Sequence, residues 1–167
     1  MMLTSHAKLP LWLSRYDFTW LLIFLSMGLV NVACTAAQSD AINAVTFKQA
    51  KILVAGRQLD VEFADSWTLR SRGLMFRQSL CDDCGLLFKF KPPRQVAMWM
   101  KNTYVPLDVA YFKADGIITD IKALQPEDLT SVGSSGAISY ALEMNQGWFA
   151  KHRVAVGDKI QVLATSN

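Results

Sequence analysis

Short apolar segments separated by turn-forming residues run through most of this chain, and this alternation limits the folds that it can adopt. The pattern predicts two short helices, at about 65–76 and 147–152, and strands at residues 47–54, 59–63, 85–90, 95–102, 107–112, 117–124, 138–144 and 159–164. Many short strands with only two short helices are typical of an α+β fold. We therefore expect a small, mostly antiparallel sheet that can curl into a barrel.

Glycine and proline mark the expected breaks between these segments. Ala55-Gly56 and Ala114-Asp115-Gly116 are typical of tight turns, and Lys91-Pro92-Pro93-Arg94 predicts a break after the third strand. Residues 125–136 are rich in Pro, Asp, Ser and Gly and predict a surface loop. Gly73 lies inside the first expected helix, where glycine costs roughly 1 kcal/mol relative to alanine, and so indicates close packing or an early helix end.

The middle of the chain carries its most varied side chains. If residues 95–102 form a strand, Trp99 and Lys101 share one face, which can be an exposed platform or the rim of a ligand site. Met98 and Met100 share the other face, which is typical of a core.

The first part of the chain has the features of an export signal. Lys8 and Arg15 precede an uncharged apolar run at residues 18–30, and small residues come after it. A positive region, an apolar region of this length and small residues after it predict a secretory leader. We therefore expect the rest of the chain on the periplasmic side of a bacterial cell envelope.

The fate of this leader stays open among three outcomes. A signal peptidase could cut near Ala36 or Ala37. Cys34 could instead be lipidated, although Asn31 stands where a lipoprotein signal has a large aliphatic residue. Finally, residues 18–37 could remain as a membrane anchor, because about 20 uncharged residues can span a bilayer.

The composition limits which structures the chain can form and which partners it can bind. Hydrophobic residues make up 51% of the 167, which suffices for a packed core and excludes wholesale disorder. The net charge is only +3 and no run of Lys or Arg appears, so we expect no nucleic-acid partner. We divide the chain into a leader or anchor at 1–37, a tether at 38–46 and one domain at 47–165.

Six blocks along the body of the chain resemble those of a known family. They are Arg72–Arg77, Gly85–Phe90, Met98–Thr103, Pro106–Asp108, Leu142–Asn145 with Gly147, and Val156–Asp158. In identity and order they resemble the DUF192 family, over roughly residues 47–163. The family is a small domain of unknown function, often preceded by a signal or lipoprotein leader. The resemblance implies a compact β-rich fold and an envelope location, and it implies no established reaction.

Cys81-Asp82-Asp83-Cys84 is a C-x-x-C motif that admits several interpretations. A redox motif needs a stabilised thiolate, which the two aspartates disfavour, and no βαβ pattern surrounds it. A zinc site would need further ligands, and His152 is the only histidine after the leader. We predict a local disulfide between Cys81 and Cys84, which suits an oxidising compartment, with no metal and no cofactor. Free thiols remain an alternative.

Methionine offers a second kind of sulfur ligand. Cu(I) prefers thioether and thiolate donors, which Met75, Met98, Met100 and Met144 could supply. Methionine also fills gaps in cores, and that is the interpretation we favour here. Handling of a soft metal, copper or zinc, through Met98, Met100 and the cysteine pair stays as an alternative.

Asp108 and Glu143 are the acidic residues of the family-like blocks. They could hold loops in place by pairing with basic residues, or contact a ligand. They could also act together in acid–base catalysis if the two carboxyl groups lie close together in one cleft. No nucleophile motif accompanies them. The alternative function is therefore a hydrolase or isomerase that uses these two carboxylates.

Aromatic and basic residues could form a binding surface. Trp99, Lys101, Tyr104 and Trp148 together could stack on sugars, peptides or anionic groups, although a tryptophan partly buried at a barrel rim fits equally well. We predict a non-enzymatic module that binds a small ligand or an envelope protein. Its expected shallow site is formed by Arg72, Trp99, Lys101, Asn102, Asp108 and Glu143.

Overall fold

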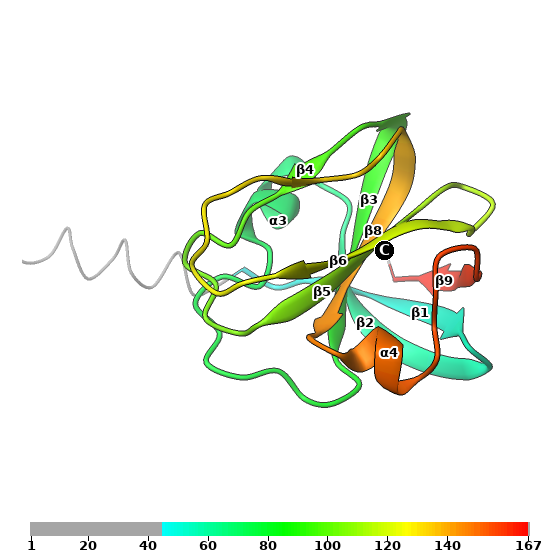
Figure 1. The fold of residues 1–167 in the computed structure, drawn as a ribbon, viewed down its shortest axis with the longest axis horizontal. Helices are drawn as coiled ribbons and strands as arrows, with labels where there is room; N and C mark the ends of the chain where they lie inside the picture. Colours follow the sequence, from blue (N-terminus) through cyan, green and yellow to red (C-terminus); the bar gives the residue numbers. More distant parts are fainter. Residues whose placement is uncertain (1–44, 167) are drawn as a thin grey trace, which may run out of the picture. The chain divides into compact units, whose positions relative to one another are not determined.

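A seven-stranded sheet organises residues 45–166, which are the residues that the computed structural model describes (Figure 1). Its strands are β1 Lys48–Val54, β2 Arg57–Ala64, β3 Gly85–Arg94, β5 Leu107–Phe112, β6 Ile118–Leu124, β8 Ile138–Asn145 and β9 Ile160–Thr165. They lie in the order β6-β5-β8-β3-β2-β1-β9. Neighbouring strands are antiparallel except β2 and β3, which run parallel. The expected leader, most of the tether and the lipidation candidate Cys34 lie outside the described residues.

Four short elements flank this sheet. The helices are α3 Trp67–Arg72 and α4 Trp148–Lys151, and the strands β4 Ala97–Met98 and β7 Val132–Gly133 pair with each other in a separate two-stranded sheet. The expectation of a mostly antiparallel α+β fold is therefore confirmed. Within residues 45–166, no helix has both the length and the apolar character needed to cross a membrane.

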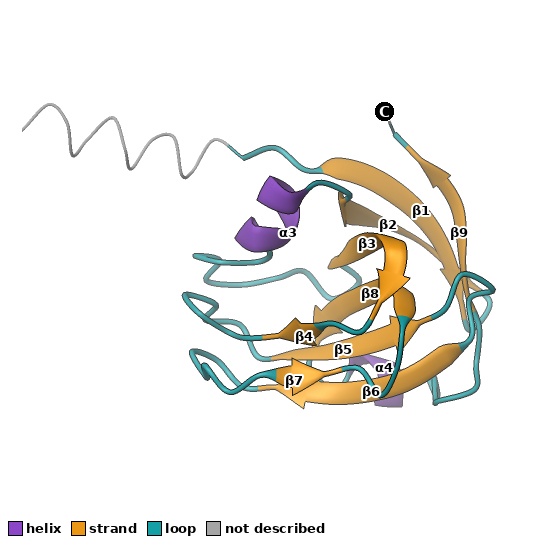
Figure 2. Cartoon of the chain, turned by 90° about the horizontal axis from the view of Figure 1, so that it is seen from above, coloured by secondary structure: helices purple, strands orange, loops and turns teal. Residues whose placement is uncertain are grey.

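The sheet is not closed into a barrel, so the closure that we considered possible does not occur. Its edge strands β6 and β9 meet only beside one end, through an isolated bridge between Ile117 and Lys159, and then diverge (Figure 2). Closure requires a continuous ladder of hydrogen bonds along both edges. At the bridge the backbones are close, because a Cβ on Gly116 would lie 2.3 Å from the carbonyl oxygen of Ile160.

Three segments differ from the sequence prediction, each for a local reason. Strand β3 continues through the expected break at residues 91–94, where Arg94 resumes pairing with Ile138 after a register shift. The expected strand at 95–102 shrinks to the two residues of β4, because the chain turns through a positive φ of 54° at Asn102. Helix α3 is capped by the Ser66 side chain and ends before Gly73, whose φ is 47°, earlier than the expected end near residue 76.

The two faces of the sheet bury two separate hydrophobic clusters. On the face that α4 covers, called here the α4 face, the cluster includes residues of β1, β2, β5 and β8 together with Trp148 and Phe149. On the opposite face, called here the α3 face, the cluster includes Leu86, Val109 and Ala141, with Leu69 of α3 packed against it. The central strands β3, β5 and β8 contribute to both clusters, so they are buried on both sides.

Candidate functional site

A cleft of about 350 Å³ opens on the α3 face, between α3, the loop that follows it and the segment around β4. Its wall includes three arginines, four aromatic residues, two methionines and one acid: Arg70, Arg72, Arg94, Trp67, Phe88, Phe90, Trp99, Met75, Met98 and Glu143. This volume lies within the range of small-molecule sites in proteins. We refer to it below as the cleft.

Backbone geometry that is unusual for the residues involved shapes the rim of the cleft. Gly73 ends α3 with a φ of 47°, a backbone conformation that residues with a Cβ rarely adopt. Its N–H donates to the carbonyl of Leu69 at 3.0 Å. Phe76 and Asn102 also have positive φ, 66° and 54°. The Phe76 N–H donates to the Asn102 carbonyl at 2.7 Å, so the loop after α3 is tied to the turn after Trp99.

Two of the arginines are held by backbone carbonyls and an aromatic ring. The Nη1 of Arg70 donates to the carbonyls of Asp65 and Lys89, at 2.8 and 3.0 Å. Arg70 and Arg94 both lie over the Phe90 ring, at 5.5 and 5.2 Å from its centroid. Burial, and then the charge of Arg94, lower the pKa of Arg70. These two cations therefore concentrate positive charge beside Phe90.

Arg72 lacks the hydrogen bonds to backbone carbonyls that hold Arg70. Its guanidinium lies over the Phe76 ring at 4.7 Å from the centroid, and within residues 45–166 its side chain has no hydrogen bond or ion pair. Its Nη1 atom is buried without a partner among the described residues. Burial and the nearby charge of Arg77 lower the pKa of Arg72. Arginine nevertheless stays protonated in proteins, so the cleft contains a cation that no acid among these residues neutralises.

Glu143 is the buried acid of the cleft. It lies on β8 opposite Leu86 and Val109 and is only 6% exposed. Burial raises its pKa to about 8, so its carboxyl is mainly protonated at neutral pH. Burial also raises the pKa of the neighbouring Tyr111, with a smaller contribution from Glu143, and the Tyr111 hydroxyl donates to the Val132 carbonyl at 2.6 Å.

Three of the six predicted binding residues line the cleft: Arg72, Trp99 and Glu143. The other three do not. Lys101 is exposed in a turn, the carbonyl of Asn102 accepts the bond from Phe76, and the Asp108 carboxylate accepts a bond of 2.8 Å from the N–H of Gly147.

Asp108 and Glu143 lie on opposite faces of the sheet. Residues directly opposite each other in a ladder share a face, and Glu143 pairs with Val109 whereas Asp108 pairs with Met144. Val109 belongs to the cluster of the α3 face and Met144 to that of the α4 face. The alternative in which both carboxylates act in one catalytic site is therefore wrong for this fold.

Among the arginines and tryptophans of the cleft, sequence reasoning missed Trp67, Arg70 and Arg94. Arg70 lies only two positions before Arg72 in the expected helix, so a pair of basic residues near one helix end was visible. Arg94 lay in the expected break, and only the extension of β3 brings it beside Phe90. No pattern in the sequence connects these distant segments.

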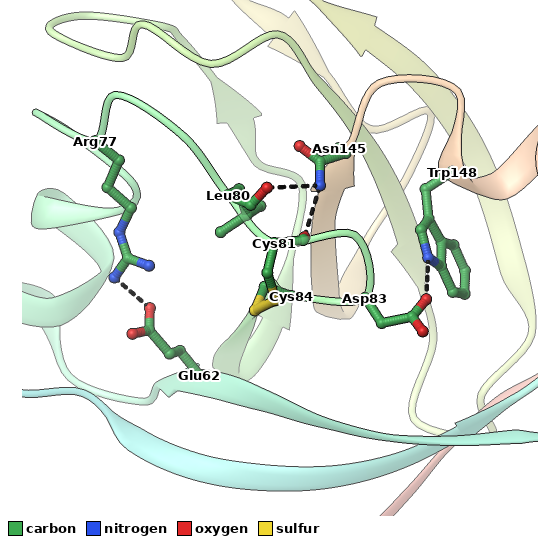
Figure 3. The surroundings of a disulfide bond; sticks show 8 residues. All are labelled: Glu62, Arg77, Leu80, Cys81, Asp83, Cys84, Asn145 and Trp148. Carbon is green, nitrogen blue, oxygen red and sulfur yellow. Dashed lines mark hydrogen bonds and ion pairs between the residues drawn. A yellow bond between two sulfur atoms is a disulfide. The ribbon is translucent and has the colours of Figure 1, made fainter.

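The cysteine pair lies away from the cleft, beside α4 (Figure 3). Cys81 and Cys84 are at disulfide distance, with Cα atoms 5.0 Å apart, and their sulfurs are bonded to each other. The Asn145 amide donates to the Cys81 carbonyl at 2.8 Å, and the Trp148 indole donates to Asp83 at 2.9 Å. The Trp148 bond is the main cause that lowers the pKa of Asp83. The disulfide loop is thus attached to β8 and α4.

The sulfur atoms that we considered for a soft metal do not form one group: Met75 and Met98 line the cleft, whereas Met144 and the cysteine pair lie elsewhere. The two cysteine sulfurs bond each other, so they are not thiolate ligands in this state. Met100 is 2% exposed in the core of the α3 face, and Met144 belongs to the core of the opposite face. Among the described residues, no group of three or more His, Cys, Asp or Glu is placed to hold a metal ion.

Comparisons with known proteins give a family and a fold. Two crystal structures are similar to this chain. One is a protein from Sinorhizobium meliloti 1021 described as a "putative transcription regulator", with 34% identity, a TM-score of 0.66, and coverage of 71% of this chain and 96% of that one. The other is a protein of unknown function from Novosphingobium aromaticivorans DSM 12444, with 27% identity, a TM-score of 0.62, and coverage of 72% and 96%.

No curated protein matches the chain. The model of one family, DUF192, described as "Uncharacterized ACR", matches residues 50–162, which is most of the domain and more than half of the chain. The chain therefore belongs to the DUF192 family of uncharacterised proteins.

Proposed function

We propose that this domain is a non-enzymatic binding module of the bacterial cell envelope, which holds a small ligand or a short segment of a partner protein in the cleft. The observation that carries the proposal is the cleft itself, in which Arg72, Trp99 and Glu143 gather from three separate segments of the chain. Concave sites that combine aromatic walls with a few polar groups are the usual form of ligand sites.

The chemistry of the cleft favours binding over catalysis. Glu143 is its only acid, so the pairing of acid and base that hydrolysis or isomerisation would use is absent from the described lining. The lining also contains Ser71 and Thr103 but no histidine or lysine that could activate a hydroxyl. Arginine and tryptophan, in contrast, are the residues that most often dominate recognition.

The envelope location rests on two features. The apolar run at residues 18–30 predicts export, and a disulfide such as Cys81–Cys84 persists in oxidising compartments. A test of location is a fusion of the full chain to alkaline phosphatase, an enzyme that is active only after export. High phosphatase activity with the natural leader, and none when residues 1–37 are deleted, would support the proposal; equal activity in both would refute the envelope location.

The binding proposal is tested by a thermal-shift screen of the full-length protein in a mild detergent. The panel contains sugars, peptidoglycan fragments, nucleotides, small organic acids and amides, and a DNA duplex, the last because of the description given to the Sinorhizobium relative. A ligand at 100 times its Kd stabilises the folded state by about 2.7 kcal/mol, which such a screen detects. We expect at least one hit whose shift is lost in Trp99→Ala but kept in the exposed control Tyr104→Ala. Hits that both variants keep would place binding elsewhere.

A further inference from the structure

We propose that the cleft selects small organic acids, with Arg72 binding their carboxylate or phosphate group and Trp99 contacting their apolar body. This inference rests on the proposed function, because it names the ligand class of the same cleft. The feature that leads to it is the guanidinium of Arg72, which lines the cleft and has no hydrogen bond or ion pair among residues 45–166; its Nη1 atom is buried there without a partner. Buried polar atoms are nearly always hydrogen-bonded, so an arginine that lacks an acceptor is a candidate for an anionic partner.

Residues 45–166 do not balance the positive charges around the cleft. Within the described residues, none of Arg70, Arg72 and Arg94 forms a salt bridge. The nearby acids already have other partners. Asp65 pairs with Lys48 at 3.0 Å, although it still raises the pKa of Arg70, and Glu62 pairs with Arg77.

Glu143 does not supply the missing negative charge. It lies in the sheet floor between Leu86 and Val109, and burial keeps its carboxyl mainly protonated at neutral pH. In that form it offers an O–H donor to the cleft instead of a charge that would repel an acid. The cleft is therefore cationic, and a cationic concave surface attracts anions.

The remaining wall suits an apolar or planar body. Trp99 is 57% exposed and Trp67 is 75% exposed, although both line the cleft. Large aromatic side chains that remain exposed beside a cavity provide stacking surface for a ligand. Phe88 and Phe90 form the deeper, buried part of the wall. An anionic group at Arg72 joined to a ring or short apolar chain would use both parts of the cleft.

The test compares acids with neutral ligands that contain the same aromatic ring. Isothermal titration of the full-length protein in detergent uses two pairs of probes, benzoate with benzamide and phenyl phosphate with phenol. We expect each acid to bind about tenfold or more tightly than its neutral partner, because hydrogen bonds to charged groups are the stronger ones. The ratio between the two acids distinguishes carboxylate from phosphate as the preferred group. Equal affinities within both pairs would overturn the inference and leave the proposed function standing.

Variants assign the charge preference to one residue. Arg72→Met should remove the preference for the acids while leaving benzamide and phenol unchanged, and Arg72→Lys should keep part of it. Lys101→Met removes an exposed cation outside the cleft and is the matched control. It should change neither the preference for the acids nor the affinities for benzamide and phenol. A preference that survives Arg72→Met but is lost in Lys101→Met would refute the role of Arg72. Absence of binding for all four probes would overturn the inference, and a thermal-shift screen in which Trp99→Ala matches the natural protein for every ligand would overturn the proposed function as well.

Discussion

The two faces of the sheet bury similar sets of apolar side chains but differ in what else they contain. The α4 face is closed by Trp148 and Phe149, which are 3% and 1% exposed and belong to its hydrophobic cluster. The α3 face includes the buried Glu143 and is covered incompletely, so a cleft remains beside Trp99. Burying an ionisable group costs stability, and a protein retains such a cost mainly where the group has a use. On our proposal, the α4 face serves mainly to hold the fold together, and the α3 face contains the proposed ligand site.

Trp148→Ala should give the largest loss of stability and should leave the cleft intact. Trp148 fills the core of the α4 face and donates a hydrogen bond to Asp83, so its removal leaves a large cavity and an unpaired acceptor. We expect a loss of about 3–5 kcal/mol in the free energy of unfolding, measured by urea denaturation. Leu163→Ala, at a residue 49% exposed on β9, is the control and should change little. A loss below about 1 kcal/mol for Trp148→Ala would contradict the role given to the α4 face.

Glu143→Gln should change how stability depends on pH. The pKa of Glu143 rises from 4.5 to about 8 in the folded protein, so between these values the folded state keeps a proton that the unfolded state releases. Stability is then fully present below about pH 4.5 and falls as the pH rises toward 8, by at most about 1.4 kcal/mol per pH unit. Glu143→Gln should remove this decline and make the protein more stable than the natural chain near pH 8.

The matched control for that experiment is Glu127→Gln, because Glu127 is exposed in the loop before β7. Urea denaturation at several pH values between about 5 and 9 measures both variants. The stability of Glu127→Gln should fall with rising pH as much as that of the natural chain. If the stability of Glu143→Gln falls with pH as that of the natural chain does, then the carboxyl of Glu143 is not protonated at neutral pH in the folded protein.

The double variant Cys81→Ser, Cys84→Ser should have a smaller effect, limited to the α4 side. The bond joins residues only three positions apart, for which chain entropy gives a stabilisation of about 2 kcal/mol. Hydrogen exchange should increase in the loop and around Asn145 and Trp148, which contact it, and not around Trp99. Equal increases on both faces would show that the two halves of the fold are coupled.

Trp99→Ala should have the smallest effect on stability, in contrast to Trp148→Ala. Its side chain is 57% exposed at the rim of the cleft, so little apolar area is lost from the core. We expect a change within about 0.5 kcal/mol in the free energy of unfolding, together with loss of ligand binding. A loss of several kcal/mol would mean that Trp99 is part of the core and would weaken its assignment to the site.

Local structure could be predicted where neighbouring residues decide it. Strand β5 was predicted with its observed ends, since its apolar side chains are flanked by Pro106 and by the turn at Ala114–Gly116. The turn at Ala55-Gly56 is also confirmed, with both residues at positive φ. In contrast, the strand expected at 95–102 failed, because the N–H of Met100 and the C=O of Asn102 bond to distant loops instead of a neighbouring strand.

The sequence by itself determined the class of fold, most strands, the capped start of α3 and the residues Arg72, Trp99 and Glu143 as candidates, since each depends on side-chain type and short-range spacing. The tertiary structure decided which of them meet. The register between β5 and β8 placed Asp108 and Glu143 on opposite faces, and the arrangement of α3, β3 and β4 brought Arg70 and Arg94 into one cleft. Contacts between segments far apart in the chain depend on the register and curvature of the whole sheet, which no local pattern specifies.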